Sequence, residues 1–343
     1  MIRTIALRTS IVLGTVTTVL VVVVTVLYLV NAGEYSVPAT TADDPSLPYI
    51  EIEGYRFHGE TLGNPSDPTV IVLHGGPGGD YRSLLPLRDL ADQYFVVFYD
   101  QRGAGLSPRV GEEQLTVERY VADLELLIDR FSPDDPALLI GHSWGAMLAS
   151  TYIGRRPETI AAAVLAEPGF LDHAGMEYFK ETTGLSGTSP SLSVMAAMSK
   201  YWAESLHIDG PDEHARRDYL MGAFFSAPIE NHPLGGYYPE NDVRNAAGEF
   251  RRFGALASQA VYQSGLDPEG RLIDLAAGVE HFSGPVLFLT GSENSIIGEE
   301  RQRIHMRRFQ NADLTVIPDA GHTMIGEKPK ESVAVIRRFF NEQ

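Results

Sequence analysis

A serine flanked by two glycines stands in the middle of the chain, between an apolar run and a helix-like run. The residues 141–145 read Gly-His-Ser-Trp-Gly, and the apolar run 137–140 before them predicts a buried strand. A strand, a Gly-x-Ser-x-Gly turn and a helix over 146–154 hold a serine hydroxyl at the apex of a tight bend, where it can attack a carbonyl carbon. We therefore predict Ser143 as a nucleophile. A serine that only caps the helix is the alternative interpretation.

A second glycine-rich loop is suited to binding the negative charge that such an attack creates. The sequence His-Gly-Gly-Pro-Gly-Gly at 74–79 directly follows an apolar, β-branched run over 69–73. Backbone N–H groups in this kind of loop can form an oxyanion hole together with the N–H of the residue after the nucleophile. We predict that Gly75, Gly76 and Trp144 contribute these donors. A phosphate-binding loop is disfavoured because no Gly-Lys-Ser/Thr ending is present.

The general base is expected to be a histidine late in the chain, on a loop after the last strand. The sequence Asp-Ala-Gly-His-Thr-Met places His322 between a predicted strand over 314–317 and a predicted closing helix over 332–340. We therefore predict His322 as the base. A histidine in an ordinary surface loop is the alternative.

Three motifs together resemble those of a known family. The sequences HGGPGG at 74–79, DQRGAGLS at 100–107 and GHSWGA at 141–146 are similar to motifs of prolyl iminopeptidases and their relatives in the α/β-hydrolase superfamily. The resemblance implies an α/β-hydrolase fold, with a mostly parallel sheet, helices on both faces and a helical cap. It also implies removal of an N-terminal residue, typically proline, from a small peptide, or hydrolysis of an amide or ester of similar shape. No metal and no cofactor are implied.

The acid of the triad is the point where this chain departs from the family pattern. The resemblance implies an Asp three residues after Gly291, but Asn294 stands there. An amide in place of the carboxylate typically lowers the rate by ~10⁴-fold. We predict that Glu167, after the strand expected over 160–166, supplies the acid, because some haloalkane dehalogenases of the same fold resemble this arrangement. Glu293 and the absence of any acid are the two alternatives.

Substrate recognition in an iminopeptidase-like enzyme requires a partner for a free α-amino group, and carboxylates on the cap can provide it. We predict Glu204 for this role, with Trp202 as an apolar wall, while Glu230 and Glu240 are weaker candidates. Acidic residues on cap helices are more often part of a solvated surface.

The order of the predicted elements indicates how these loops come together. Apolar strand-like runs alternate with amphipathic helices, which predicts an α/β fold with a parallel sheet covered on both faces. We assign this core to residues 48–167 and 283–343. The intervening residues 168–282 are mostly helical and are predicted to form the cap over the ligand-binding edge of the sheet. Residues 32–47 are small, polar and without periodicity, which is typical of a stalk.

The N-terminal residues 1–31 contain an apolar run over 11–30 that is free of charged residues. Twenty helical residues span about 30 Å, the thickness of a bilayer core. Arg3 and Arg8 precede the run, and Glu34 follows it, so the positive-inside rule places the catalytic part outside the cytoplasm. An uncleaved single-pass anchor is the first interpretation and a cleaved signal peptide the second.

Composition narrows the functional classes further. The formal net charge of −18 argues against nucleic-acid binding, and the absence of cysteine excludes disulfides and thiolate chemistry.

We therefore predict a serine hydrolase of iminopeptidase type, with a carboxylesterase or lipase as the alternative enzyme. Epoxide hydrolases and dehalogenases are disfavoured because they need a carboxylate nucleophile at position 143. A catalytically silent extracellular binding module is the alternative from another class. The oligomeric state stays open.

Overall fold

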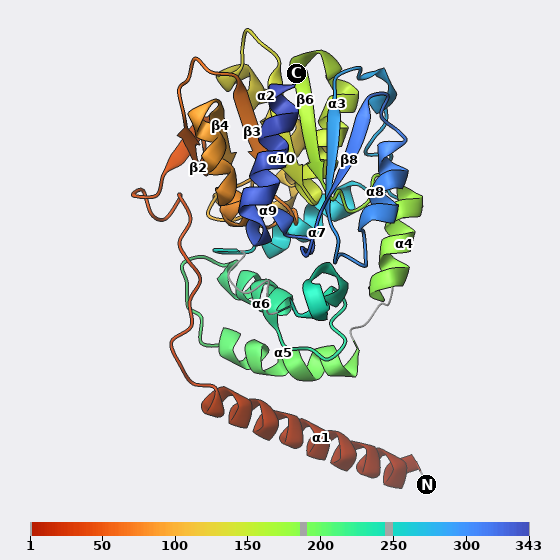
Figure 1. The fold of residues 1–343 in the computed structure, drawn as a ribbon. Helices are drawn as coiled ribbons and strands as arrows, with labels where there is room; N and C mark the ends of the chain where they lie inside the picture. Colours follow the sequence, from red (N-terminus) through yellow and green to blue (C-terminus); the bar gives the residue numbers. More distant parts are fainter. Residues whose placement is uncertain (1, 186–190, 244–249, 343) are drawn as a thin grey trace.

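The computed structural model describes residues 2–185, 191–243 and 250–342, with the backbone alone for residues 2–12. Its centre is an eight-stranded sheet in the order β1-β2-β4-β3-β5-β6-β7-β8 (Figure 1). The first two strands pair antiparallel with their neighbours, and β3 to β8 run parallel. The strands are β1 (Tyr49–Ile52), β2 (Tyr55–Leu62), β3 (Thr69–Leu73), β4 (Phe95–Tyr99), β5 (Ala137–His142), β6 (Ile160–Ala166), β7 (Val286–Gly291) and β8 (Ala312–Ile317).

Helices cover both faces of this sheet, as the predicted α/β class requires. Apolar side chains form two large buried clusters, one on each face, because the inner strands are buried on both sides. The first face carries α2 (Val117–Phe131), α3 (Trp144–Arg155) and α8 (Glu299–Met306), and the second carries η1 (Tyr81–Asp92), α9 (Met324–Glu327) and α10 (Pro329–Asn341). Thr116 caps α2 as its sequence suggests, since its hydroxyl accepts a hydrogen bond from the Arg119 amide at 3.2 Å.

One helix differs from its sequence-based description. Residues 83–93 predict a helix with Pro86 in its first turn, but η1 is wound as 3₁₀ turns and begins at Tyr81. Asp80 explains the earlier start, because its carboxylate accepts a hydrogen bond from the Arg82 amide at 2.9 Å. Pro86 therefore lies inside the helix.

The segment between β6 and β7 is mostly helical and covers the end of the sheet that carries Ser143 (Figure 1). It contains α4 (His173–Thr183), α5 (Leu192–Ser205), α6 (Ala215–Ser226), the short turns η4 (Gly235–Tyr237) and η5 (Pro239–Asn241), and α7 (Ala255–Ser264), with η7 (Val279–His281) before β7. Ala257, Ala260 and Val261 of α7 belong to the same buried cluster as α2. Helix α7, near the C-terminal end of the predicted cap, therefore packs into the buried core of the sheet.

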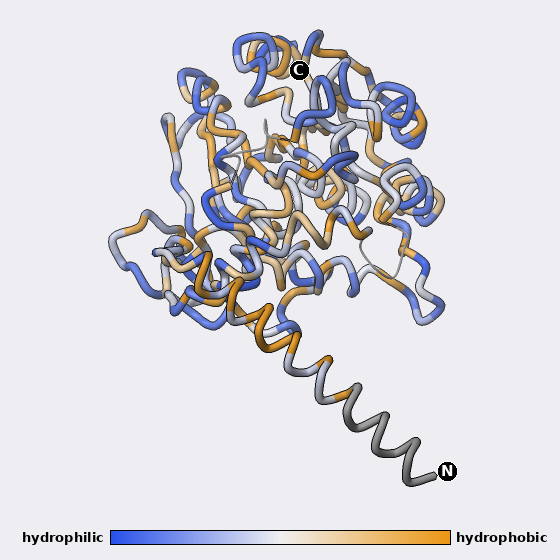
Figure 2. Tube along the Cα trace, turned by 90° about the horizontal axis from the view of Figure 1, so that it is seen from below, coloured by the Kyte–Doolittle hydropathy of each residue, from blue (hydrophilic) through white to orange (hydrophobic). Residues whose placement is uncertain are grey.

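The N-terminal helix α1 (Ile2–Val30) projects from the body beside the cap (Figures 1 and 2). Its segment Leu13–Val30 has a mean hydropathy of 2.5 and none of it is buried, so by length and composition it can cross a membrane. A signal sequence near the N-terminus meets the same criterion.

The predicted stalk is anchored at its C-terminal end instead of hanging free. The Thr41 amide donates to the Leu106 carbonyl at 2.9 Å, and the Thr41 hydroxyl donates to the Arg56 carbonyl at 2.6 Å. Arg252 donates to the carbonyl of Pro38 at 3.0 Å. Small polar residues without periodicity can therefore pack by backbone hydrogen bonds, which sequence pattern alone does not reveal.

Candidate active site

Ser143 lies at the sharp bend between β5 and α3. Its φ of 54° and ψ of −118° belong to a strained backbone region that a non-glycine residue rarely adopts. A Cβ at Gly141 would collide with the backbone of Gly145 and Ala146, and a Cβ at Gly145 would collide with the carbonyl of Leu73. Both glycines are therefore required for the close approach of α3 to the strands.

His322 lies on the loop after β8, and its ring contacts Glu167. The Nδ1 atom of His322 is 2.6 Å from Oε2 of Glu167, and both side chains are buried. A carboxylate partner at Nδ1 favours the tautomer that carries its proton there, which leaves Nε2 free to accept one. In the described part of the chain, no hydrogen bond joins the Ser143 hydroxyl to His322, but both residues line one cavity. Such contacts often tighten only when substrate binds.

Glu167 directly follows β6 and has a positive φ of 46°. Its Oε1 accepts hydrogen bonds from the Thr290 hydroxyl at 2.5 Å and from the Gly291 amide at 2.9 Å. Complete burial raises the pKa of Glu167 to about 7, although these hydrogen bonds act in the opposite direction. Burial also lowers the pKa of His322 to about 3, so its imidazole is neutral at neutral pH.

Asn294 occupies the position where the resemblance implies an acid, and it binds Glu167. Its Nδ2 donates to Oε2 of Glu167 at 2.6 Å, and its Oδ1 accepts from the amides of Ile296 and Ile297 at 3.0 and 3.1 Å. Glu293 is exposed and accepts a hydrogen bond from the hydroxyl of its neighbour Ser292. The structure therefore brings Glu167 to His322 and leaves Glu293 outside the site.

The loop of His322 is also held by two aromatic neighbours. His142 Nε2 is 2.8 Å from the His322 carbonyl, and the two rings are 4.6 Å apart. Tyr237 of the cap stacks on the His322 ring at 4.2 Å, and its carbonyl accepts the His322 amide at 2.6 Å. The sequence analysis missed Tyr237, because its only signal was aromatic content in a helical segment.

The predicted oxyanion loop lies beside the serine. A Cβ on Gly75 would be 3.0 Å from Cβ of Ser143, and Gly76 has a φ of 42°. Trp144 begins α3, so its amide lies in the first turn, where no intrahelical acceptor exists. Its indole donates to Gln101 at 2.8 Å. The structure thus places Gly75 and Trp144 beside Ser143, and Gly76 lines the same cavity.

The loop after β4 braces this arrangement. Asp100 accepts hydrogen bonds from the Tyr81 and Leu106 amides, at 3.1 and 2.8 Å. Arg102 forms a bidentate ion pair with Asp123, with both distances 2.8 Å. These residues are buried and hold neighbouring loops together, so their role is structural.

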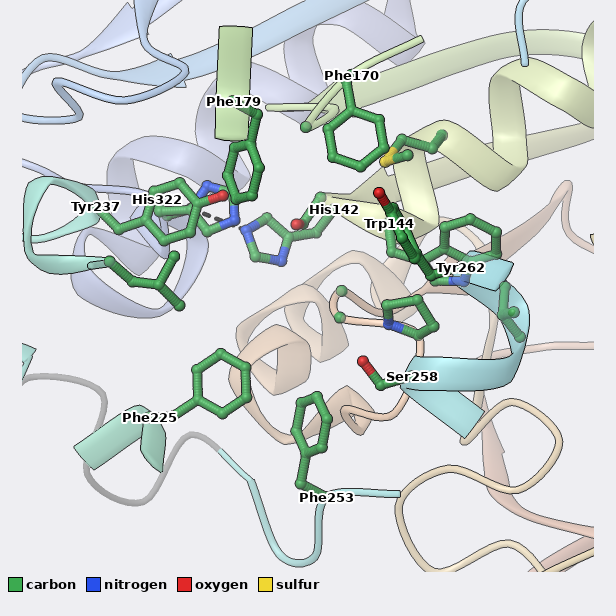
Figure 3. A pocket seen from close by; sticks show the side chains of 18 of the residues that line it. His142, Trp144, Phe170, Phe179, Phe225, Tyr237, Phe253, Ser258, Tyr262 and His322 are labelled. Atoms are coloured by element: carbon green, nitrogen blue, oxygen red, sulfur yellow. Dashed lines mark hydrogen bonds between the residues drawn. The ribbon is translucent and has the colours of Figure 1, made fainter. Parts of the chain in front are cut away.

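A cavity of about 410 Å³ lies between the core loops and the cap. Figure 3 shows Phe170, Phe179, Phe225 and Phe253 around the rings of His142 and His322. Among the described residues that line it, none is Asp, Glu, Lys or Arg. The cavity therefore suits an apolar group next to the reacting carbonyl.

The predicted substrate residues do not reach this cavity, which corrects the assignment of Glu204 and Trp202. Glu204 is buried between helices, where it accepts a hydrogen bond from the Tyr219 hydroxyl at 2.7 Å and pairs with Lys200 at 3.5 Å. Trp202 points outward and is 40% exposed. The physical reason is the rotation of α5, which turns position 204 towards α6 and position 202 to the surface. Glu230 and Glu240 are exposed and also lie outside the lining.

Comparison with known proteins agrees with this fold. The family model described as alpha/beta hydrolase fold matches residues 68–329. A proline iminopeptidase of Saccharolobus solfataricus is 38% identical over 291 residues, which cover 81% of this chain and 86% of that protein. Matches to three further proline iminopeptidases span only 42%, 45% and 41% of their lengths.

Solved structures of an iminopeptidase and of an esterase show the same fold. A proline iminopeptidase of Mycobacterium smegmatis has a TM-score of 0.57 at 18% identity, over 87% of this chain and 98% of its own. A thermophilic esterase from Thermogutta terrifontis has a TM-score of 0.57 at 17% identity, over 91% and 99%. The family match and the 38% identical relative show that this chain belongs to the α/β-hydrolase fold family and is prolyl iminopeptidase-like.

Proposed function

We propose that the protein is a serine hydrolase that cleaves esters with an apolar acyl group. The observation that carries the proposal is the buried contact of 2.6 Å between His322 and Glu167, in a cavity that Ser143 also lines. A nucleophile, a base and an orienting carboxylate on three separate loops are the elements of acyl transfer.

The reaction proceeds in two steps. Ser143 Oγ attacks the carbonyl carbon while His322 Nε2 takes its proton, and the alcohol then leaves with that proton. Glu167 stabilises the imidazolium, and amides of the 75–76 loop and Trp144 donate to the oxyanion. Water then attacks the acyl-enzyme by the same route and regenerates the Ser143 hydroxyl.

The lining of the cavity supports an ester over a peptide with a free amino terminus. An α-ammonium group loses its hydration on entry, and none of the described lining residues offers a carboxylate in return. Burial of an unpaired charge is costly, so an uncharged acyl group is the better occupant. Iminopeptidase activity is the second candidate, and the 38% identity to the Saccharolobus solfataricus protein favours it.

The test uses the full chain with two substrates and one probe. We expect labelling of Ser143 by a fluorophosphonate and faster hydrolysis of p-nitrophenyl butyrate than of proline β-naphthylamide. Both labelling and hydrolysis should be lost in Ser143→Ala and kept in Ser258→Ala, a matched change elsewhere on the cavity wall. Faster turnover of the naphthylamide would favour the second candidate. A chain that neither reacts nor hydrolyses would instead be a silent binding module.

A further inference from the structure

The end of α1 is attached directly to the cap. The ring of Tyr28 stacks on His207, just after α5, with centroids 4.1 Å apart. His207 Nε2 is also 3.0 Å from the Tyr28 carbonyl. A few residues later, Tyr35 packs edge-on against Tyr219 of α6 at 6.1 Å. The end of α1 and the residues just after it are therefore held against the cap, so a free linker does not connect α1 to the body.

The part of the cap beside α1 carries an unusual share of exposed apolar side chains. Outside α1, seven large apolar residues of the described chain are exposed, and five of them lie on α4, on α5 or in the loop after α4. Leu192, at 83% exposure, and Met195 and Trp202 follow each other at helical spacing along α5. Of the remaining two, Leu185 lies in the loop after α4, whereas Tyr178 faces α8, where Arg301 lies over its ring at 3.7 Å. We call Leu185, Leu192, Met195 and Trp202 the apolar cap surface.

The exposed part of α5 differs in charge from the chain as a whole. The net charge is −18, yet the exposed residues of α5 include no carboxylate, because its one acidic residue, Glu204, is buried. Lys200 is exposed on the same helix. A tryptophan and a lysine beside apolar residues are typical of a surface that lies at a lipid headgroup layer.

Leu185 connects this surface to the active-site cavity. Its side chain is 44% exposed, and it also lines the cavity, together with Phe179 of α4. An acyl chain can therefore pass from the apolar cap surface to the cavity along apolar contacts.

We propose that α1 is a membrane span and that the apolar cap surface rests on the same bilayer, from which the cavity takes its substrate. The substrate is then an ester of a membrane-dissolved acyl chain, which rests on the serine hydrolase function proposed above. The bilayer is favoured over a protein partner because α1 ends against the cap and holds it at the membrane. Figure 1 shows α1 running below α5, and the two helices are in contact.

Contact with lipid is tested without any reference to catalysis. The chain has two tryptophans, and Trp144 is buried in the active site, so Trp202 dominates as a reporter at the cap surface. In the full chain reconstituted in phosphatidylcholine–phosphatidylglycerol vesicles, we expect dibromo-phosphatidylcholine to quench the fluorescence. The quenching should disappear in Trp202→Phe. Absence of quenching in the natural chain, or equal quenching in the variant, would overturn the docking.

Delivery from the bilayer is tested with a double variant and a matched control. Leu192→Glu with Met195→Glu places two charges on the apolar cap surface, whereas Ile304→Glu places one on the exposed side of α8, a helix of the core. We expect the double variant to hydrolyse p-nitrophenyl palmitate in vesicles about tenfold more slowly, because the apolar contact with lipid is weakened. Its hydrolysis of soluble p-nitrophenyl butyrate and both activities of the control should not change.

The outcomes separate the two proposals. An unchanged palmitate rate in the double variant, or an equal fall for both esters, would overturn delivery from the bilayer. If lipid quenching is absent while butyrate hydrolysis is normal, the docking proposal is wrong and the hydrolase proposal stands. Butyrate hydrolysis that survives in Ser143→Ala would overturn the hydrolase mechanism, while the quenching result would still decide the docking.

Discussion

The loops of the core and the helices of the cap build opposite walls of one cavity in different ways. Ser143, His322 and Glu167 each follow a strand of the same sheet. The amides of Ser143 and Glu167 donate to the carbonyls of Ala166 on β6 and Leu289 on β7 at 2.8 and 3.0 Å, and glycines that no side chain can replace surround Ser143. The cap contributes Tyr237, Phe225 and Phe253 from helices and turns that meet only in the folded chain. Reactive groups therefore lie at rigid strand ends, whereas the more variable segment shapes the part of the cavity that selects the substrate.

The largest expected effect is on the core side, at the acid. Glu167→Gln should lower kcat by about 10⁴-fold, because an amide does not stabilise the imidazolium of His322. Glu293→Gln, the matched change on the loop after the neighbouring strand β7, should leave kcat unaltered, since Glu293 is exposed and does not contact the histidine. Steady-state hydrolysis of p-nitrophenyl butyrate measures both. Similar small losses in the two variants would contradict the assignment of Glu167.

The same carboxylate predicts the pH dependence of the core chemistry. Burial raises the pKa of Glu167 to about 7, so the charged form is lost as the pH falls through this value. The protonated acid no longer stabilises imidazolium, and kcat/KM should fall about tenfold per pH unit on the acid side. A profile from pH 5 to 9 checks this. A rate that stays level down to about pH 5 would mean that Glu167 is ionised there.

A smaller effect is expected at Asn294, which positions the acid. Asn294→Ala removes a hydrogen bond to the charged carboxylate, and such bonds contribute about 1.5–3 kcal/mol. The pKa of Glu167 should therefore rise further, so the acid limb of the profile should move to higher pH and the rate above it should fall about tenfold. Asn294→Gln keeps an amide, so it should shift the acid limb less and lower the rate less than Asn294→Ala does. A lower rate without any movement of the acid limb would indicate a general loss of structure.

The smallest effect is expected at the cap residue that sequence assigned to the substrate. Glu204→Gln should leave KM and kcat unchanged for esters and for proline β-naphthylamide, because Glu204 bonds Tyr219 away from the cavity. Phe225→Ala, which opens the cavity wall, should raise KM for acyl esters as a matched comparison on the cap. A KM for the naphthylamide that rises only in Glu204→Gln would restore the earlier assignment and weaken the contrast between core and cap.

The local pattern of apolar residues in the sequence was enough to predict most of the core. The runs 69–73 and 160–166 predict β3 and β6 at the same bounds that the structure shows, because continuous apolar runs of this length fit strands buried on both faces. The turn at Ser143 is predictable because only glycines fit beside it. The end of the stalk was less predictable, because Thr41 is held by backbone partners that are distant in sequence.

The sequence by itself therefore determined the α/β class, the serine turn and the histidine loop, since each depends on residues that are neighbours along the chain. Only the tertiary structure decided which carboxylate meets His322 and which cap residues line the cavity. Glu167 and Asn294 are 127 residues apart, and their contact depends on the adjacency of β6 and β7. The rotation of α5 likewise depends on its packing against α6, which hides Glu204 and exposes Trp202.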